Sequence, residues 1–110
     1  MNDSTLIELF RALGDPIRWK VVTALRGGTQ CACELGAASG VAPSLLSHHL
    51  GVLRDAGIVT SQRRGKWIDY SLVGGVLEDL ADEVSVTAVV HRDGASAAGS
   101  RCEVDEVVAG

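Results

Sequence analysis

The stretch from Cys31 to Leu72 constrains the fold more than any other part of the sequence. It contains a short helix-like segment, a break at Gly40, a longer amphipathic segment, and two strand-like runs that flank a charged turn. Apolar residues of the longer segment recur at i, i+4 and i+7, which predicts one buried stripe along a helix. This order of elements predicts a helix-turn-helix followed by a β-hairpin, the wing. The buried stripe consists of Leu46, Leu50 and Leu53.

Another face of the longer helix carries small, uncharged side chains that can form hydrogen bonds. Such a surface can approach base edges and phosphates in a major groove, from which bulky side chains would hold the helix away. Cations at the tip of the wing are suited to bind backbone phosphates. We therefore expect double-stranded DNA as the partner. The expected contact residues are Ser44, Ser47, His48, Arg54, Arg63, Arg64 and Lys66.

Three further helices are predicted around this unit. Apolar spacing predicts a first helix over about 4–13 and a last helix over about 73–91, and an Asp-Pro pair starts a second helix over about 16–26. Within the second helix, Arg18 and Lys20 are expected to be exposed to solvent, since isolated cations on helices usually are.

Several runs of this chain resemble the ArsR/SmtB family of bacterial metal-sensing winged-helix repressors, over about Leu6 to Val90. The resemblance implies a mainly helical α+β fold with a small β-hairpin, in which the helices pack as a homodimer. It also implies a transcriptional repressor that holds an inverted-repeat operator when metal-free and changes its DNA affinity when a metal ion binds. The runs that carry the resemblance are LGDPIR, SLLSHHLGVLRDAGIV and RRGKWIDYSL.

The sequence departs from this family at the start of the recognition helix, the second helix of the helix-turn-helix. Relatives usually have a Ser cap and a polar residue there, whereas this chain has Ala42 and Pro43. Proline suits the first helical position, but alanine cannot cap a helix.

Cys31 and Cys33 stand at the predicted start of the helix that ends near Gly40. A helix N-terminus lowers the pKa of a thiol and favours the thiolate that binds metals. Residues two apart in a regular helix point about 200° apart, so both thiols could reach one ion only if the first turn unwound. By resemblance, thiolate-sensing members have a Cys-x-Cys at this place, and the third cysteine of arsenic-sensing members corresponds here to Gly36.

A further ligand must therefore come from elsewhere, and we expect Cys102, with His91 as an alternative. Thiolates favour soft or borderline ions, so the expected effector is As(III), Cd(II), Pb(II) or Zn(II), with Ni(II) as an alternative for a mixed site. A second, zinc-type site of relatives falls here on Gly74 and Val76, which cannot ligate.

Three other interpretations remain open. The two cysteines can be small, partly buried hydrophobic residues. The chain can be a winged-helix regulator without its own metal site, responding to redox conditions or depending on a co-regulator protein. It can also be a metal-binding or interaction module that has lost operator specificity.

Charge is divided unevenly along the 110 residues, which have room for one folded domain. Residues 1–73 carry eight Lys and Arg against six Asp and Glu, a net +2, whereas 74–110 carry two against eight, a net −6. The acidity thus lies away from the predicted DNA-binding face. We expect a DNA-binding and dimerisation domain over 1–91 and a flexible acidic tail over 92–110.

The composition also indicates a compartment. No apolar run approaches the roughly 20 residues needed to cross a bilayer, and the N-terminus lacks the pattern of a signal peptide. Three cysteines without an export signal indicate free thiols in a reducing compartment. We therefore expect a cytoplasmic protein that does not bind membranes. Since no Ser/His/Asp arrangement, phosphate-binding loop or carboxylate pair is present, we expect no enzymatic activity.

Overall fold

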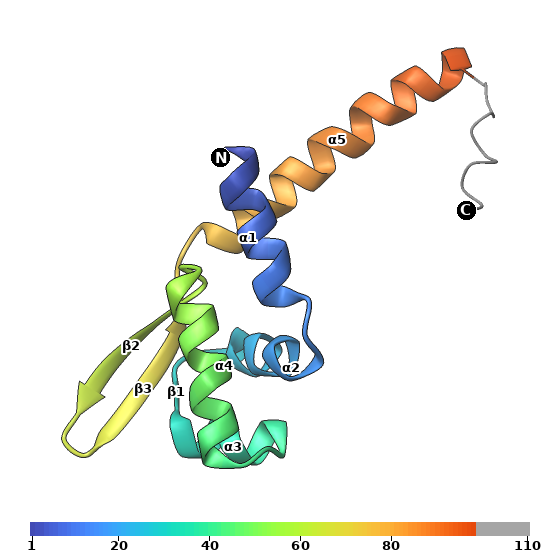
Figure 1. Cartoon of the computed structure of the whole chain (residues 1–110). Helices are drawn as coiled ribbons and strands as arrows, with labels where there is room; N and C mark the ends of the chain where they lie inside the picture. The colour runs from blue at the N-terminus through green and yellow to red at the C-terminus, as the bar shows by residue number, and fades with distance from the viewer. Residues whose placement is uncertain (99–110) are drawn as a thin grey trace. The chain divides into compact units, whose positions relative to one another are not determined.

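The computed structural model describes residues 1–98, with side chains up to residue 89. The chain divides into two units at Leu77, and only the first contains a sheet among the described residues. The helix α5 (Val76–Ala98) begins at the end of the first unit and forms the described part of the second. The first unit consists of α1 (Asp3–Leu13), α2 (Pro16–Ala24), the 3₁₀ turn η1 (Leu25–Gly27), β1 (Gln30–Cys31), α3 (Ala32–Ser39), α4 (Pro43–Asp55), β2 (Val59–Arg64) and β3 (Trp67–Leu72) (Figure 1).

The starts of the helices follow local capping chemistry. The Asn2 side chain accepts a hydrogen bond from the N–H of Thr5 at the start of α1. Asp15 caps α2, whose first residue is a proline as the sequence predicts. Ala42 precedes α4 and makes no side-chain capping bond, which confirms the departure noted in the sequence. The recognition helix α4 therefore depends on tertiary contacts, which it makes with α1, α2, α3 and β2.

The sheet has three antiparallel strands in the order β1-β3-β2, and β2 and β3 form the predicted wing. The strand β1 was not predicted, because two residues are too few to show the alternation of a strand. It pairs Gln30 with Tyr70 and Cys31 with Asp69. This pairing connects the start of α3 directly to the wing.

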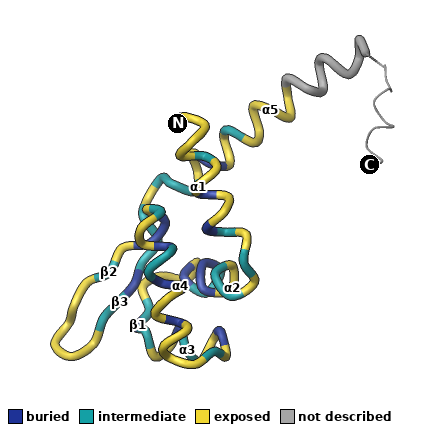
Figure 2. Tube along the Cα trace, viewed as in Figure 1, coloured by how far each residue is buried: buried dark blue, intermediate teal, exposed yellow. Residues whose placement is uncertain are grey.

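The core of the first unit lies where the helices meet the sheet. The predicted stripe of α4 is buried, with exposed fractions of 4%, 2% and 0% for Leu46, Leu50 and Leu53. On the wing, Tyr70 is buried and Trp67 is exposed, as their odd spacing predicts. Figure 2 shows buried positions in α2, α4 and the sheet, whereas the turn of the wing is exposed. Further buried side chains are Leu9, Val21, Val22, Leu25, Leu35, Ile58 and Val59.

Two helices differ from the sequence prediction. Phe10 of α1 is exposed, although it shares the apolar spacing that predicts this helix. The helix α5 continues to Ala98, beyond the predicted end near His91. The helical spacing of apolar residues ends near His91, but the alanines that follow favour a helix even without such spacing. No helix among residues 1–98 is long and apolar enough to cross a membrane.

Candidate DNA interface and thiol site

The recognition helix α4 turns a polar face to solvent. Its predicted contact residues Ser44, Ser47, His48 and Arg54 are all exposed. His49, the neighbour of His48, is buried instead. The exposed face therefore combines hydroxyl groups, one imidazole and one guanidinium, which are groups that can donate hydrogen bonds to bases and phosphates.

The tip of the wing carries cations in two different states. Nε of Arg64 donates to Oδ2 of Asp69 at 2.8 Å, and its Nη2 donates to Oδ1 at 3.1 Å. This hydrogen bonding lowers the pKa of Asp69 and raises the pKa of Arg64. The charge of Arg64 is thus compensated within the wing, a pairing the sequence did not reveal because Asp69 comes from the opposite strand.

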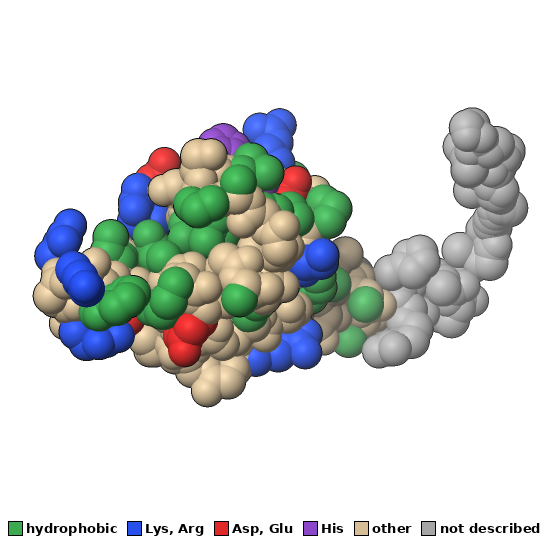
Figure 3. Space-filling view, turned by 90° about the horizontal axis from the view of Figure 1, so that it is seen from below, with side chains coloured by type: hydrophobic (Ala, Val, Ile, Leu, Met, Phe, Trp, Pro, Cys, Tyr) green, Lys and Arg blue, Asp and Glu red, His purple; other side chains and the backbone are tan. Residues whose placement is uncertain are grey.

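Arg63 and Lys66 are the other two cations of the tip. Arg63 has no carboxylate partner among the described residues, and Nζ of Lys66 lies 5.6 Å from the ring centroid of Trp67. Figure 3 shows Lys and Arg side chains gathered at the left-hand edge, over the tip of the wing. Of the three predicted wing contacts, these two are therefore the better placed to bind phosphates.

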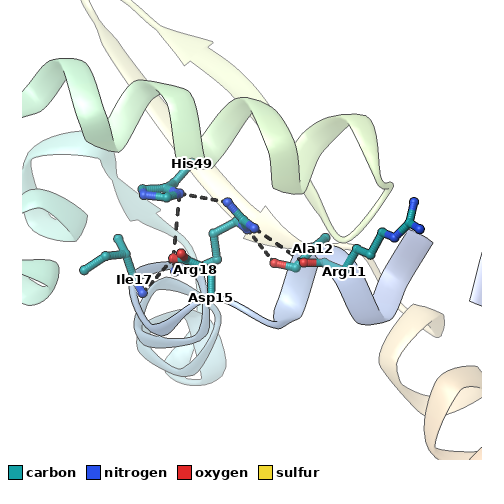
Figure 4. A network of polar contacts seen from close by, with 6 residues as sticks. All are labelled: Arg11, Ala12, Asp15, Ile17, Arg18 and His49. Carbon is teal, nitrogen blue, oxygen red and sulfur yellow. Dashed lines mark hydrogen bonds and ion pairs between the residues drawn. The ribbon is translucent and has the colours of Figure 1, made fainter. Parts of the chain in front are cut away.

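Arg18 holds the recognition helix in place, although the sequence indicated a solvated side chain. It is half-buried, and its Nη1 donates to Nδ1 of His49 at 3.0 Å. Its Nε donates to the carbonyl of Ala12 at 2.6 Å, and its Nη2 to that of Arg11 at 3.4 Å. Figure 4 shows this side chain reaching from α2 to both the end of α1 and α4. One cation thus joins three helices.

The acceptor role of His49 follows from the chemistry of arginine. A guanidinium only donates, so Nδ1 of His49 must accept, and a neutral ring then carries its proton on Nε2. Oδ2 of Asp15 lies 3.8 Å from the same Nδ1. The buried imidazole is therefore set between a cation and a carboxylate, both from the region where α2 begins.

We expect replacement of Asp15 by Ala to destabilise the fold in a pH-dependent way. The N–H groups of Arg18 and Ile17 donate to the carboxylate at 3.1 and 2.9 Å, and the bond from Arg18 contributes most to lowering the pKa of Asp15. A lowered pKa means that this stabilisation is present above the unfolded-state pKa and is lost as pH falls through the folded-state pKa. Urea unfolding at neutral and acidic pH should show a loss of stability in the variant at neutral pH that shrinks in acid.

Asp55→Ala, at an exposed carboxylate in the last turn of α4, provides the control, and the two variants are compared at each pH. A destabilisation by Asp15→Ala that stayed constant over the whole range would contradict the capping role.

The two cysteines of the Cys-x-Cys lie together. Cys31 precedes α3 with an extended backbone (φ −80°, ψ 164°), and Cys33 lies in the first turn of that helix. Their Sγ atoms are 2.7 Å apart, with Cys31 buried and Cys33 exposed. The expectation that the first turn must unwind was therefore wrong, because Cys31 ends β1 and is not part of the helix.

The pKa of Cys33 is shifted in the opposite direction to the one expected from a helix start. The hydrogen bond with the Cys31 sulfur, followed by burial and by the charges of Cys31 and Glu34, raises the pKa of the Cys33 thiol. The hydrogen bond from the N–H of Glu34 acts in the opposite direction and is the smallest of the causes. The N–H of Cys31 already donates to Oε1 of Glu34 at 2.8 Å.

Further ligands are not gathered around this pair among the described residues. No group of three or more His, Cys, Asp and Glu side chains in that part of the chain could hold a metal ion. Cys102 lies outside the described residues, as does the side chain of His91. The site as described offers two sulfur donors, which suit one soft ion.

Known proteins share this architecture. Residues 15–61 match the family "Bacterial regulatory protein, arsR family". The chain is 35% identical over 71 residues to the transcriptional repressor SdpR of Bacillus subtilis, covering 64% of this chain and 79% of that protein. It is 38% identical over 80 residues to a transcriptional repressor SmtB homolog of Synechocystis, covering 73% of this chain but only 61% of that protein.

A solved structure is similar throughout most of the chain. The ArsR-like transcriptional regulator from Rhodococcus sp. RHA1 superposes with a TM-score of 0.73 at 30% identity, covering 84% of this chain and 89% of that one. The sequence comparisons and the winged helix-turn-helix structure thus indicate the same family. The chain belongs to the ArsR family and is a DNA-binding transcriptional regulator, not an enzyme.

Proposed function

We propose that this regulator is a homodimeric repressor that binds an inverted-repeat operator and releases it when Cys31 and Cys33 bind a thiophilic ion. The observation that carries this proposal is the approach of the two sulfurs to 2.7 Å at the junction of the wing and α3. The resemblance to the ArsR/SmtB family supplies the expectation of a metal response.

The position of the thiol pair suits a switch, because both cysteines are connected to the DNA-binding elements. Cys31 pairs with Asp69 of β3, and that carboxylate holds Arg64 of the wing. Cys33 lies in α3, which contacts α4. A movement of Cys31 would therefore displace the wing, and a movement of Cys33 would displace the recognition helix. By thermodynamic linkage, DNA must weaken ion binding by the factor by which the ion weakens DNA binding.

The residues fit a soft or borderline ion. Two thiolates favour As(III), Cd(II), Pb(II) or Zn(II), and Ni(II) remains the alternative for a mixed site. Cys102 is the proposed third donor, and His91 is the alternative. Cys31 and Cys33 would hold such an ion, which would supply a soft acceptor for thiolate electron pairs. The effect on DNA binding would pass through the pairing of Cys31 with Asp69 and the contacts of α3 with α4.

A redox response is the second candidate function, because sulfurs this close can also form a disulfide. Titration of the reduced protein with each ion separates the two candidates. Thiolate charge-transfer absorbance should rise as operator affinity falls, at the same ion concentration. Operator release on oxidation alone, with no effect of any ion on the reduced protein, would favour the redox regulator.

For the wing, we expect Arg63→Ala and Lys66→Ala to weaken operator binding more than Arg64→Ala does. The slope of the logarithm of operator affinity against the logarithm of salt concentration falls in magnitude by about one for each lost phosphate contact. A variant that carries both Arg63→Ala and Lys66→Ala should therefore lose about two per protomer. The smaller effect of Arg64→Ala is expected because Asp69 already compensates its charge. Affinities measured at several salt concentrations test this, with Arg26→Ala in η1 as a control. An Arg64→Ala variant that lost as much as either of the others would contradict the assignment.

For the homodimer, we expect the charged double variant Ile7→Glu, Phe10→Glu to be monomeric. Ile7 and Phe10 of α1 are 47% and 44% exposed, which leaves an apolar surface on this helix. Ile7 and Phe10 are three positions apart and so lie on one face of the helix, and contiguous exposed apolar surface marks interaction sites. Sedimentation should show a dimer for the parent and for the control Leu45→Glu. A parent protein that was monomeric and bound a single half-site as tightly as the full operator would refute the proposal.

A further inference from the structure

A pocket of about 580 Å³ opens between α3, α4 and β3. Among the residues that the structure describes, no charged side chain lines it, and its polar side chains are one thiol and two hydroxyls. Figure 3 views the molecule from below, where hydrophobic side chains gather beside the cations of the wing. The apolar lining includes Gly36, Leu46, Leu50 and Ile68, and the polar side chains are those of Cys33, Ser47 and Tyr70.

The strand β3 separates this pocket from a polar surface of the sheet. Ile68 and Tyr70 line the pocket, whereas Asp69 and Ser71 line a different, polar depression. This alternation is expected of a strand, whose successive side chains point to opposite faces. The charge of Asp69 is also compensated by Arg64. The pocket therefore favours an uncharged ligand.

Tyr70 supplies a buried polar group without a partner. It is 7% exposed, and its hydroxyl forms no hydrogen bond with any described residue. Such a buried hydroxyl is unfavourable, and most buried polar groups have a partner. A water molecule would satisfy it but would leave the apolar walls hydrated, which is also unfavourable. A molecule with an apolar body and one hydroxyl group satisfies both.

The size and the walls of the pocket suit a ligand of one or two rings. Pockets for small molecules commonly measure about 300 to 1,000 Å³ and are mostly apolar, with a few polar groups that fix the orientation of the ligand. A cavity of roughly 150 Å³ already holds a benzene molecule. The walls belong to the core, because Leu46 and Leu50 are buried.

We propose that this pocket binds a small uncharged organic effector with a body of one or two aromatic rings and one hydroxyl group, the class of phenols and naphthols. The hydroxyl group of the ligand pairs with that of Tyr70, and the rings lie against Leu46, Leu50 and Ile68. Cys33 contributes only part of the wall, so this inference does not depend on the proposed thiol response.

The pocket is placed to couple such a ligand to DNA binding. Its walls come from the recognition helix α4 and from the wing strand β3, the two elements expected to contact the operator. Ser47 lines the pocket, is exposed, and belongs to the face expected to contact DNA. A bound ring therefore competes with DNA for the surface around Ser47. Operator affinity should fall by about 5-fold or more at saturating ligand, within the usual range of such coupling.

The test measures the binding of 2-naphthol to the full reduced chain by calorimetry at neutral pH, where the compound is uncharged. It should bind at one molecule per chain. Its charged counterpart 2-naphthoate should bind about 10-fold more weakly or worse, because no cation of the described chain lines the pocket to offset the desolvation of the carboxylate. Equal or tighter binding of 2-naphthoate would overturn the inference.

The variant Tyr70→Phe tests the hydrogen bond. It keeps the aromatic wall and removes only the hydroxyl, so the ligand-free protein should fold. Its affinity for 2-naphthol should fall by roughly 2- to 10-fold, the effect of one hydrogen bond. Its affinity for naphthalene, which lacks the hydroxyl group, should equal that of the parent protein. A merely structural role of Tyr70 would change both affinities alike, and that result contradicts the proposed pairing.

Two variants of α3 locate the ligand. Gly36→Leu fills the pocket, since a Cβ at this position would already lie 3.6 Å from Cδ2 of Leu46, and it should abolish the binding of 2-naphthol. Ala37→Leu, at an exposed position outside the lining, should bind as the parent does. If Gly36→Leu does not fold, the comparison of the parent with Tyr70→Phe still decides.

The outcomes separate this inference from the proposed function. The double variant Cys31→Ser, Cys33→Ser should bind 2-naphthol as the parent does, whether or not cadmium releases the operator from the parent protein. Loss of 2-naphthol binding in that variant, or retained binding in a folded Gly36→Leu protein, places the ligand elsewhere and overturns the inference. Unchanged operator affinity at saturating 2-naphthol overturns the role as an effector.

Discussion

Replacement of both Cys31 and Cys33 by Ser should abolish the response of operator affinity to thiophilic ions, while the ion-free protein still binds its operator. The response of the parent protein should be about 5- to 150-fold in affinity, equivalent to about 1 to 3 kcal/mol, which is the usual range of such coupling. The variant should fold, because Cys31 occupies the capping position of α3 and serine is among the favoured capping residues. Fluorescence anisotropy of a labelled operator, with and without cadmium, measures both quantities.

The single variant Cys33→Ser sharpens this test. Cys33 is exposed, so its replacement leaves the buried sulfur and the strand pairing of Cys31 in place. It should lose the response as fully as the double variant if both sulfurs bind one ion. If the double variant still releases DNA when cadmium is added, the sensing site lies elsewhere, and the region of His91 and the acidic α5 becomes the next candidate.

The fold was predictable because its signals are local. The spacing of apolar residues located α4, and the Asp-Pro start located α2, since both depend on residues within a few positions of one another. The wing was predictable from two strand-like runs around a charged turn. The family resemblance rested on these same segments, and the winged helix-turn-helix confirms it.

The geometry of the thiol pair was not predictable from local patterns. Cys31 is extended because it pairs with Asp69 across the sheet, a contact between residues far apart in the sequence. Helical geometry alone placed the two thiols on different sides of a helix, whereas one extended residue brings the sulfurs together. The same distant pairing explains why the state of Arg64 could not be inferred from the sequence RRGK.

Arg18 is the clearest case of a residue whose role is visible only in three dimensions. An isolated cation on a helix is usually solvated. Here its partners are a histidine in α4 and two carbonyls at the end of α1. The last turn of a helix leaves carbonyls without a full set of partners from the helix itself, and that of Arg11 accepts locally only from the N–H of Gly14, at 3.3 Å. A guanidinium with several donors can satisfy them and the histidine together.

We therefore expect Arg18→Met to lower the free energy of unfolding by roughly 2 to 4 kcal/mol. Hydrogen bonds to a charged group contribute about 1.5 to 3 kcal/mol each, but one of these three is long and solvent screens the half-buried charge, so the sum is smaller than three full bonds. Methionine keeps much of the aliphatic stem but none of the donors. Operator affinity should also fall at temperatures where the variant is folded, since α4 loses its link to α1 and α2.

Urea unfolding and operator binding measure the two effects, and Lys20→Met, an exposed cation of the same helix, should change stability by less than about 0.5 kcal/mol. Combining Arg18→Met with His49→Leu should cost less than the sum of the single variants, because the buried imidazole is no longer left without its donor. Strict additivity of the two substitutions, or equal stability of Arg18→Met and Lys20→Met, would show that Arg18 does not hold the recognition helix.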